Sequence, residues 1–543
     1  MPETCDVVVI GGGPGGAACA TLLAADGYRV VLLERATFPR EHVGESLLPA
    51  SIPVLEQLGV MPAIERAGFV VKRGATLVWG QDPDPWSWYF ADDPGQRPTS
   101  FQVVRSEFDD ILLRNAGERG VDVRLAHQVL EVHFQDEQAT GVDYLHDGAP
   151  GRIDCRFVVD ASGQAALLSR KLNLHQWDEY FKNLAVYGYY RDAKHLDPPN
   201  DGNIFIESYE HGWLWKIPLH TGVTSVGAVV DKDVGQQGLR ELGATGFLEA
   251  QVALAPRTRQ LLSDATLVDE PNVERDWSYT SKQFAGDGYV LVGDAACFVD
   301  PLFSSGVHLA LGSATLAANY VQSVLEQPQT REQAAQLYES LYRKQYDYFH
   351  VTAQLFYGTN RSADSYFWEA RRILGDGDTT PREAFVRVVS GQPPQGYERA
   401  VIEHGELPME IESEVRLRDE RAERRRRATE AITSEPGALF RAVPTMPAHV
   451  RLEQRRALAG ANFQQAFQLV VRSGGQSSEP YPVTAVMAAC IGQMDGRASL
   501  GEIVTNVNRQ HNLRGEQGLR TIIERDLPPL INAGLIDVAA QSV

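Results

Sequence analysis

Cysteine is scarce in this chain, and its few copies are not paired. Among 543 residues there are five cysteines, Cys5, Cys19, Cys155, Cys297 and Cys490. A zinc site needs cysteines or histidines at close spacing, and a disulfide framework needs many cysteines in a short chain. We therefore expect neither, and a reducing cytoplasm is the simplest expected location.

Basic residues are also few relative to acidic ones. The chain has 51 Lys and Arg against 71 Asp and Glu, a formal net charge of −20. A protein that follows a nucleic-acid backbone needs a surplus of cations, so nucleic acid is not an expected partner. No apolar run is long enough to span a bilayer, and residues 1–6 lack the basic and apolar regions of a secretory signal. No membrane partner is expected.

What the chain does contain is glycine in an informative place near its start. Residues 7–10 (VVVI) predict a strand, 11–16 (GGGPGG) a glycine turn, 17–26 a helix of small residues, and 28–33 a second strand that leads into Glu34. This order predicts a βαβ unit that binds a dinucleotide.

Each glycine in this turn has an expected physical role. Gly11 and Gly13 allow a tight turn and a close approach of the backbone to a pyrophosphate, and Gly16 allows the helix to pack on the strand. Glu34 is placed to hold ribose hydroxyls. The strand before the turn, the helix after it and the acid at the right distance make a chance glycine turn a poor alternative.

Two later segments have the same apolar-strand character. Residues 157–163 (FVVDASG) end in small residues, and residues 288–296 (GYVLVGDAA) end in Gly293-Asp294 before a helix. These segments resemble the FAD-binding motifs of the para-hydroxybenzoate hydroxylase-like flavoproteins, whose flavin-contacting arginine matches Arg105. The resemblance implies FAD as the cofactor. Only one glycine-rich fingerprint is present, so we expect a separate flavin reductase to supply the reductant.

The stretch from Gly212 to Pro218 (GWLWKIP) is the most distinctive in the chain. In a strand, residues two apart face the same side, so Trp213 and Trp215 would present their indoles together while Leu214 and Lys216 face away. On spacing alone, these tryptophans are most simply two core side chains.

Together with three other segments, this stretch resembles the flavin-dependent halogenases, over most of residues 1 to about 370. Residues 213–218 match the family's W-x-W-x-I-P signature, and Lys72 stands where the family has its essential lysine. Residues 38–40 with 44–49 (FPR and GESLLP) look like the family's segment along the flavin. Residues 300–308 (DPLFSSGVH) look like the loop that contacts the isoalloxazine and holds halide.

The resemblance implies a reaction and a set of roles. FADH2, O2 and chloride would yield hypochlorous acid, which Lys72 would aim at the substrate while Trp213 and Trp215 keep that substrate away from the flavin. The residues expected to hold halide are Ser304, Ser305 and Gly306, where a turn entering a helix offers backbone N–H groups. Taken alone, that turn is more simply a helix cap, and a lone lysine is usually a surface group. The residues expected to bind the cofactor are Gly11, Gly13, Gly16, Glu34, Arg40, Ser46, Arg105, Asp160, Asp276, Gly293 and Asp294.

One departure bears on the substrate. The halogenases that act on free tryptophan have a glutamate in the loop where this chain has Phe303. A phenol or pyrrole needs a well-placed base less than an indole does, so we expect such a ring, either free or carried by an acyl or peptidyl carrier protein in natural-product or antibiotic biosynthesis. Residues 102–109, 176–179 and 276–279 resemble the chloramphenicol-pathway type, which leaves an activated aliphatic acyl group open.

The C-terminal third predicts mainly helices. Aromatic residues from 338 to 357 recur at helical spacing, as core residues or as a lid over the substrate. Residues 374–395 predict a loop, and 412–430 a charged helix that is either a solvated face or a docking site for an acidic carrier protein. The pattern of 436–543 resembles a winged-helix module, and the shortage of basic residues favours a packing or interaction role over DNA binding.

We therefore expect an α/β fold, namely a Rossmann-like FAD domain of the para-hydroxybenzoate hydroxylase kind with a mixed-sheet substrate domain and a helical, winged-helix-like C-terminal region. The expected divisions are a halogenase core 1–330 (FAD parts 1–70, 100–175 and 285–330; substrate side 71–99 and 176–284), a helical region 331–435 and a module 436–543. The first alternative is a flavin hydroxylase, which should lack the tryptophan pair and Lys72. The second is a reductase of the geranylgeranyl reductase kind, which needs no halide loop. The third is a non-enzymatic flavin-binding regulator.

Overall fold

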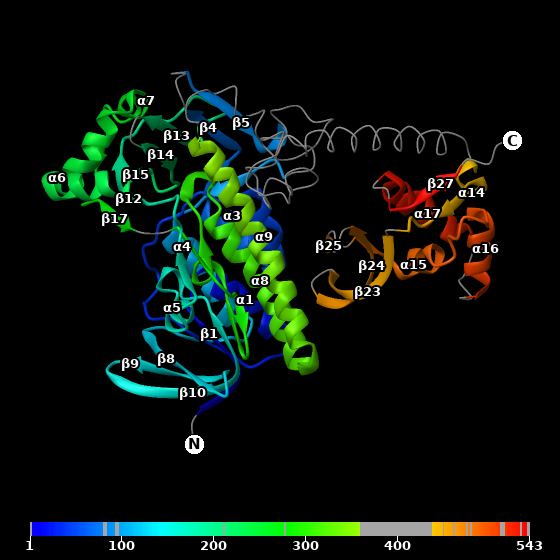
Figure 1. Ribbon diagram of the computed structural model, residues 1–543. Coiled ribbons are helices and arrows are strands. Elements are labelled where there is room, and N and C mark those ends of the chain that lie inside the picture. Colours follow the sequence, from blue (N-terminus) through cyan, green and yellow to red (C-terminus); the bar gives the residue numbers. More distant parts are fainter. Residues whose placement is uncertain are drawn as a thin grey trace. The chain divides into compact units, whose positions relative to one another are not determined.

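The computed structural model divides into two compact units, residues 1–405 and 406–543. The structure describes residues 3–79, 84–92, 97–209, 212–275, 278–358, 437–448, 450–459, 462–473, 476–477, 481–510, 516–532 and 535–539. The predicted loop 374–395, the predicted charged helix 412–430 and the candidate cofactor residue Asp276 lie outside these residues. In Figure 1 the described elements of the first unit run from blue to yellow-green, and those of the second unit run from yellow-orange to red.

The first sheet of the N-terminal unit is built on the predicted βαβ unit. Its main path runs β19-β20-β10-β1-β2-β7, with β9 beside β10 and β8 beside β9. The pairs of β1 with β10 and β2, of β10 with β20, and of β2 with β7 are parallel. The strands are β1 (Glu3–Ile10), β2 (Val30–Leu33), β7 (Asp122–Arg124), β8 (His127–Gln135), β9 (Gln138–His146), β10 (Ala149–Asp160), β19 (Ala285–Gly286) and β20 (Tyr289–Leu291).

The helix that follows β1 begins earlier than predicted. It runs from Pro14 to Ala25 (α1), and proline at the first helical position is favourable because its missing N–H would have no partner there. Every residue of β2 is buried, as expected for a parallel strand covered on both faces. Helix α1 packs against α8 (Gly306–Glu326) and α4 (Arg105–Glu118).

The second sheet of this unit is mixed, in agreement with the predicted substrate-side sheet. Its order is β16-β12-β15-β14-β13-β4-β5, with β17 also beside β12; β13 pairs β4 in parallel and β14 is antiparallel to both neighbours. The strands are β4 (Gly74–Val78), β5 (Trp86–Tyr89), β12 (Asn183–Arg191), β13 (Ile204–Tyr209), β14 (Gly212–Pro218), β15 (Val223–Asp231), β16 (Thr266–Leu267) and β17 (Asn272–Arg275).

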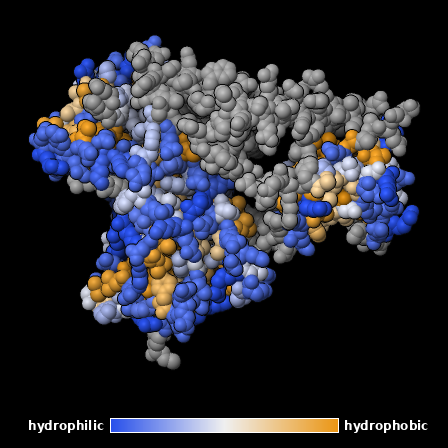
Figure 2. Space-filling view, in the orientation of Figure 1, coloured by the Kyte–Doolittle hydropathy of each residue, from blue (hydrophilic) through white to orange (hydrophobic). Residues whose placement is uncertain are grey.

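One face of this sheet is covered by helix α6 (Lys232–Ala253), next to α7 (Pro256–Leu261) (Figure 1). Leu214 of β14 belongs to the same buried cluster as Phe247 and Leu248 of α6. Side chains alternate along a strand, so Trp213 and Trp215 face the other side of the sheet, as the sequence predicts. The visible surface of this unit is mostly hydrophilic, with small hydrophobic patches over α6 and over β8–β10 (Figure 2).

Smaller elements complete the unit. Strands β3 (Val70–Lys72) and β6 (Ser100–Gln102) form an antiparallel pair, and β11 (His175–Trp177), β18 (Tyr279–Ser281) and β21 (Cys297–Phe298) form a three-stranded sheet. The remaining α-helices among the described residues of this unit are α2 (Ile52–Leu58), α3 (Met61–Ala67), α5 (Leu167–Lys171) and α9 (Arg331–Gly358). Tyr338 and Tyr342 of α9 are fully buried, and the Tyr342 hydroxyl donates to the Gly293 carbonyl at 3.0 Å. The core interpretation of these two aromatic residues is confirmed.

The C-terminal unit has its own hydrophobic core, which includes Leu469, Ile503, Val504, Ile523 and Leu527. Its elements are α14 (Ala438–Arg441), β22 (Val443–Thr445), β23 (Val450–Ala459), β24 (Asn462–Ser473), β25 (Gln476–Ser477), β26 (Tyr481–Val483), α15 (Ala485–Ile491), α16 (Leu500–Gln510), α17 (Glu516–Asn532) and β27 (Asp537–Ala539). The winged-helix arrangement stays a prediction. Across the described residues of both units, no helix is long and apolar enough to cross a membrane.

Candidate active site

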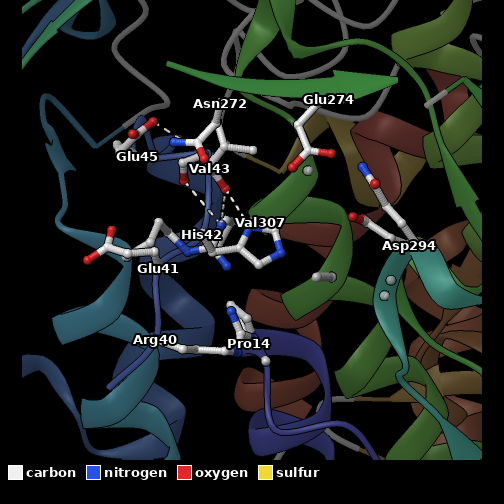
Figure 3. A pocket seen from close by; sticks show the side chains of 18 of the residues that line it. Pro14, Arg40, Glu41, His42, Val43, Glu45, Asn272, Glu274, Asp294 and Val307 are labelled. Atoms are coloured by element: carbon white, nitrogen blue, oxygen red, sulfur yellow. Dashed lines mark hydrogen bonds between the residues drawn. The ribbon is translucent and has the colours of Figure 1, made fainter. Parts of the chain in front are cut away.

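A cavity of about 1070 Å³ lies within the N-terminal unit. It is lined by the glycine turn after β1, by residues 40–46, by Trp213 and Trp215 of β14, and by residues 304–307 at the start of α8. Small-molecule sites usually measure about 300–1,000 Å³, so this cavity has room for a ligand the size of a dinucleotide. Figure 3 shows Arg40, His42, Glu274 and Asp294 around it.

The glycine turn cannot tolerate side chains at two of its positions. Gly11 has φ +102°, and a Cβ there would lie 2.3 Å from the Ala161 carbonyl oxygen. A Cβ on Gly16 would lie 2.0 Å from the Gly11 carbonyl oxygen. Gly16 therefore allows α1 to pack on β1, and it does not line the cavity. Gly11 and Gly13 line the cavity. The α1 N-terminus, where Gly13 provides no side-chain cap, leaves backbone N–H groups for an anion.

Two acidic residues predicted to contact the cofactor have different surroundings. Glu34 lines the cavity, and its carboxylate accepts from the Gly12 N–H at 2.6 Å and the Ala36 N–H at 2.7 Å, which fixes its position. Asp160 does not line the cavity; it is fully buried and accepts from the backbone N–H groups of residues 162 and 168. Asp160 thus shapes the loop after β10 in this structure.

Arg105 links the loop of residues 42–46 to α4. Its guanidinium donates to both carboxylate oxygens of Asp109, at 2.8 and 2.9 Å, and to the Val43 carbonyl at 2.6 Å. Arg40 lies 3.5 Å from the same Asp109 carboxylate. Both arginines line the cavity, so two cations share one buried anion beside it, an arrangement that suits a phosphorylated ligand.

His42 also projects into the cavity, and sequence reasoning missed it although it lies between two motifs that were noticed (Figure 3). Its Nδ1 lies 2.8 Å from the Val43 carbonyl oxygen, which can only accept, so Nδ1 carries the proton and Nε2 is a free acceptor when the ring is neutral. His42 is exposed to the cavity; partial enclosure by the cavity walls and the Arg105 charge lower the pKa of its ring, which is therefore neutral near pH 7.

Gly293 and Asp294 lie on the opposite side of the cavity, in the short 3₁₀ helix Gly293–Ala295. Burial raises the pKa of Asp294 to about 7, an effect that Arg105 opposes. A carboxyl whose pKa is close to neutral pH is present in both its protonated and its ionised form. It can therefore donate or accept a hydrogen bond, which suits the hydroxyls of a ribityl chain. The phosphate-binding turn, the paired arginines and this carboxyl together fit FAD.

The tryptophan pair forms a wall of the cavity. Trp213 is 2% exposed and Trp215 4% exposed, and their ring centroids lie 6.1 Å apart at an interplanar angle of 53°. Each indole is held by a hydrogen bond: Trp213 Nε1 donates to the Tyr357 hydroxyl at 2.7 Å, and Trp215 Nε1 donates to Ser225 Oγ at 3.1 Å. Locked indoles can act as a rigid partition.

The anchor of Trp213 continues to a buried carboxyl that sequence reasoning did not single out. The Tyr357 hydroxyl donates to Asp300 Oδ2 at 2.9 Å, and the Leu302 N–H donates to Asp300 Oδ1 at 3.0 Å. Burial raises the pKa of Asp300 to about 6. Asp300 opens the predicted halide loop and could have been noticed there. Tyr357 lies 144 residues beyond Trp213 and gave no local signal.

Glu45 is a second buried carboxyl at the cavity. Tyr189 donates from its hydroxyl to Glu45 Oε1 at 3.1 Å, and burial raises the pKa of Glu45. Ser46, the next residue, also lines the cavity, as the sequence predicts.

The three candidate halide residues are brought together on the cavity wall. Ser304 is in the left-handed region at φ 56°, Ser305 is the N-cap of α8, and Gly306 is its first residue. The Ser305 side chain makes no capping hydrogen bond, so the simple capping explanation does not account for this serine. The turn therefore presents N–H groups and the positive end of a 21-residue helix to the cavity.

Lys72 lies apart from the cavity, in strand β3. Its side chain is 2% exposed, Nζ donates to the Leu47 carbonyl at 3.1 Å, and Nζ lies 5.6 Å from the centroid of the Phe90 ring. Burial lowers the pKa of Lys72 to about 7, so much of the amine is neutral at physiological pH. The surface-lysine interpretation is wrong for this residue. Phe303, which stands where the resemblance implies a glutamate in the tryptophan-directed enzymes, is 8% exposed and lines no part of the cavity.

Comparisons with known proteins bear on these residues. The family model described as tryptophan halogenase matches residues 6–99 and 93–395. A tryptophan 2-halogenase of Chondromyces crocatus is 34% identical over 402 residues, covering 72% of this chain and 76% of the relative. A flavin-dependent halogenase of Armillaria mellea is 36% identical over 371 residues, covering 64% of this chain and 73% of the relative.

Solved structures give the same assignment. The myxobacterial chondrochloren halogenase, described as a variant of FAD-dependent halogenases, has a TM-score of 0.64 at 41% identity and covers 72% of this chain and 91% of its own. The flavin-dependent halogenase CmlS has a TM-score of 0.71 at 28% identity and covers 100% of this chain and 96% of its own. The expected α/β fold with mixed sheets is confirmed.

Proposed function

The chain belongs to the tryptophan halogenase family and is a flavin-dependent halogenase, and on this basis we propose that it makes hypochlorous acid, which Lys72 directs to an activated aromatic substrate. A separate flavin reductase supplies the reduced cofactor. When bound, FADH2 supplies the two electrons that reduce O2 in the presence of chloride. In balance, FADH2, O2, chloride and a proton give FAD, water and hypochlorous acid.

The residues of this chain do the positioning. Ser304, Ser305 and Gly306 hold chloride with backbone N–H groups at the start of α8. None of these three residues carries a carboxylate that would repel the chloride ion. Trp213 and Trp215 close the cavity, so a substrate cannot reach the flavin and take up oxygen directly. This partition favours halogenation over hydroxylation.

The observation that carries the proposal is the burial of Lys72. A neutral amine has a lone pair, and desolvation provides a large neutral fraction near pH 7. The amine can hydrogen-bond hypochlorous acid, or react with it to form an N–Cl bond with loss of water. Arginine stays protonated, so it cannot replace lysine in this role.

The proposed substrate is a phenol or pyrrole, free or bound to a carrier protein. Its support is Phe303, an apolar residue where the tryptophan-directed enzymes have a glutamate. A ring with an electron-donating hydroxyl or nitrogen needs less help from a base when it loses its proton. The name of the Chondromyces crocatus relative points to tryptophan instead, so tryptophan belongs in the substrate test.

The decisive experiment supplies the full-length protein with a flavin reductase, NADH, FAD, O2 and chloride or bromide. Free and carrier-bound phenols, pyrroles, tryptophan and acyl groups are then examined by mass spectrometry. Halogen incorporation that depends on Lys72, and is lost in both Lys72→Met and Lys72→Arg, is the expected result. A product that gains oxygen and never halogen would contradict the proposal and favour a hydroxylase.

A further inference from the structure

The two indoles of the cavity wall belong to a longer row of aromatic side chains. The ring centroids of Trp215 and Trp213 lie 6.1 Å apart, and Trp213 Nε1 donates to the Tyr357 hydroxyl at 2.7 Å. The centroid of the Tyr357 ring lies 5.2 Å from that of Phe181, and the Phe181 centroid lies 4.9 Å from that of Tyr180. Of these five residues, which we call the aromatic row, only the two tryptophans line the cavity. The row therefore leads away from the cavity.

The outer end of the aromatic row reaches the surface of the N-terminal unit. Tyr180 is 50% exposed, whereas its neighbour Phe181 is 3% exposed. This end is held in place, because Asp178 accepts from the backbone N–H groups of Tyr180 and Phe181 at 2.7 Å each. The other carboxylate oxygen of Asp178 contacts Nε2 of His350 in α9. The row therefore joins the cavity wall to the surface through rings that have fixed positions.

Tyr357, in the middle of the row, has a proton acceptor. Its hydroxyl donates to Asp300 Oδ2 at 2.9 Å, and the pKa of Asp300 is about 6, so this carboxyl is mostly ionised at pH 7. Burial and the Asp300 charge raise the pKa of the Tyr357 hydroxyl, so the phenol keeps its proton as long as it keeps its electrons. A phenol that loses an electron becomes a strong acid, and the hydrogen bond then passes its proton to Asp300. Tyr357 is therefore placed for reversible oxidation.

In the proposed function the cavity wall is exposed to oxidants. FADH2 and O2 form hydrogen peroxide when they react without halide, and hydroxyl radical arises when the peroxide O–O bond splits evenly. Hydroxyl radical takes one electron at a time, and indoles and phenols are among the side chains that lose an electron most readily. Trp213 and Trp215 line the cavity in which this oxidant forms. An indole that stays oxidised adds oxygen and no longer forms the same wall, so a supply of electrons from elsewhere protects it.

We propose that the aromatic row carries electrons from the surface to the tryptophan wall and so repairs the wall after a one-electron oxidation. The proposal rests on the proposed function only in that FADH2 and O2 must react in the cavity. Phe181 is not oxidised itself, and its ring fills the space between the two tyrosines. The electron source at the surface is a small thiol, which reaches Tyr180 from the solvent.

Electrons and protons balance at each step. Trp213 gives one electron to hydroxyl radical, which becomes hydroxide, and Tyr357 refills Trp213 while its phenolic proton moves to Asp300. Tyr180 then gives an electron to Tyr357, which takes its proton back from Asp300, and the Tyr180 proton goes to water. The thiol returns a hydrogen atom to Tyr180. After two such passes, the two thiol-derived radicals combine into a disulfide.

The first test needs bound FAD but neither halogenation nor O2. Blue light that falls on the FAD-loaded protein without O2 draws one electron from a nearby indole, and so replaces the oxidant at the wall. A nitroso spin trap adds covalently to tyrosyl radicals that are open to solvent, and peptide mass spectrometry locates the adduct. We expect an adduct at Tyr180 and none at Tyr28, a partly exposed tyrosine outside the aromatic row.

The second test measures damage to the wall when the protein consumes FADH2 and O2 without halide or substrate. Tyr180→Phe removes the outer end of the row, so oxygen addition to Trp213 and Trp215 per FADH2 consumed should rise severalfold in peptide mass spectrometry. Tyr180→Trp keeps an oxidisable ring and should restore most of the protection, whereas Tyr28→Phe should behave as the wild-type protein. Added glutathione should protect the wild-type protein and Tyr180→Trp, and it should have little effect on Tyr180→Phe.

Equal oxidation of the two tryptophans in the wild-type protein and Tyr180→Phe would overturn the proposal, and so would the absence of an adduct at Tyr180 after illumination. Failure of the proposed function gives a different result. The wild-type protein would then form no halogenated product from FADH2, O2, halide and substrate, while the light-driven adduct at Tyr180 would still appear.

Discussion

Replacing Lys72 with methionine is expected to stabilise the fold while it abolishes halogenation. Burial lowers the pKa of Lys72 from 10.5 to about 7. Each unit of pKa shift is worth about 1.4 kcal/mol. At pH 7 the shift therefore lowers the free energy of unfolding by about 5 kcal/mol relative to a lysine that stays in water. Methionine keeps a similar length without a charge, and it loses the hydrogen bond to Leu47, worth about 1 kcal/mol. The net gain is therefore about 3–4 kcal/mol.

The pH dependence of this gain tests the cause. Between pH 7 and 10.5 the unfolded lysine holds its proton and the folded one does not, so the stability of the wild-type protein rises with pH relative to Lys72→Met. The gain should be largest at and below pH 7, fall to about 1 kcal/mol at pH 9 and vanish near 10.5. Thermal melting of both proteins from pH 6 to 9.5, with FADH2-driven halogenation measured alongside, checks it.

Two other lysines serve as matched controls. Lys216 is 2% exposed, and burial lowers its pKa to about 8, so Lys216→Met should also stabilise the protein, by a smaller amount, without loss of halogenation. Lys282 is exposed, so Lys282→Met should change neither property. If Lys72→Met melts no higher than the wild-type protein at pH 7, or if its advantage does not shrink with rising pH, then Lys72 is not held as a desolvated amine.

Three further outcomes are expected. Gly11→Ala should prevent FAD binding or folding, because its Cβ would lie 2.3 Å from the Ala161 carbonyl oxygen; FAD titration and melting check this. Tyr357→Phe should lower stability by about 1–3 kcal/mol, because Trp213 and Asp300 each lose a hydrogen-bond partner. The variant should also release more peroxide per halogenated product. A peroxide assay that finds an unchanged ratio counts against the role of Tyr357 in holding Trp213. Halogenation by the wild-type protein should fall as pH drops below about 7, because Lys72 becomes protonated, while FADH2 oxidation persists; parallel pH profiles that coincide would contradict this role.

Local sequence patterns predicted much of the site. The glycine turn after β1, the common face of Trp213 and Trp215, and the Ser304–Gly306 turn all depend on neighbours within a few residues, where strand alternation and helix termini follow simple rules. The structure places each of them at the cavity. The start of α1 was missed by three residues because Pro14 was assigned to the turn.

Long-range pairing explains what the sequence did not reveal. Lys72 is buried because β3 pairs with a strand 28 residues later, and no local pattern distinguishes it from a surface lysine. The partner of Trp213 comes from Tyr357 of α9, and the acceptor for Trp215 is Ser225 on the neighbouring strand. The cofactor role of Asp160 stays a prediction; its carboxylate accepts from the Ser162 N–H after β10 and from the Leu168 N–H of α5, and neither partner could be read from a local pattern.

The substrate argument also gains from the loop around Phe303. A carboxylate does exist nearby in the sequence, at Asp300, and it is the local candidate to replace the glutamate of the tryptophan-directed enzymes. Its oxygens, however, already accept from the Leu302 N–H and from the Tyr357 hydroxyl, with Asn183 Nδ2 3.5 Å away. An acid held by these donors orients the loop and Trp213, and it has little capacity left to remove a proton from a substrate. In the proposed function Asp300 is therefore not the base that takes the proton of the substrate, which agrees with the proposed phenol or pyrrole.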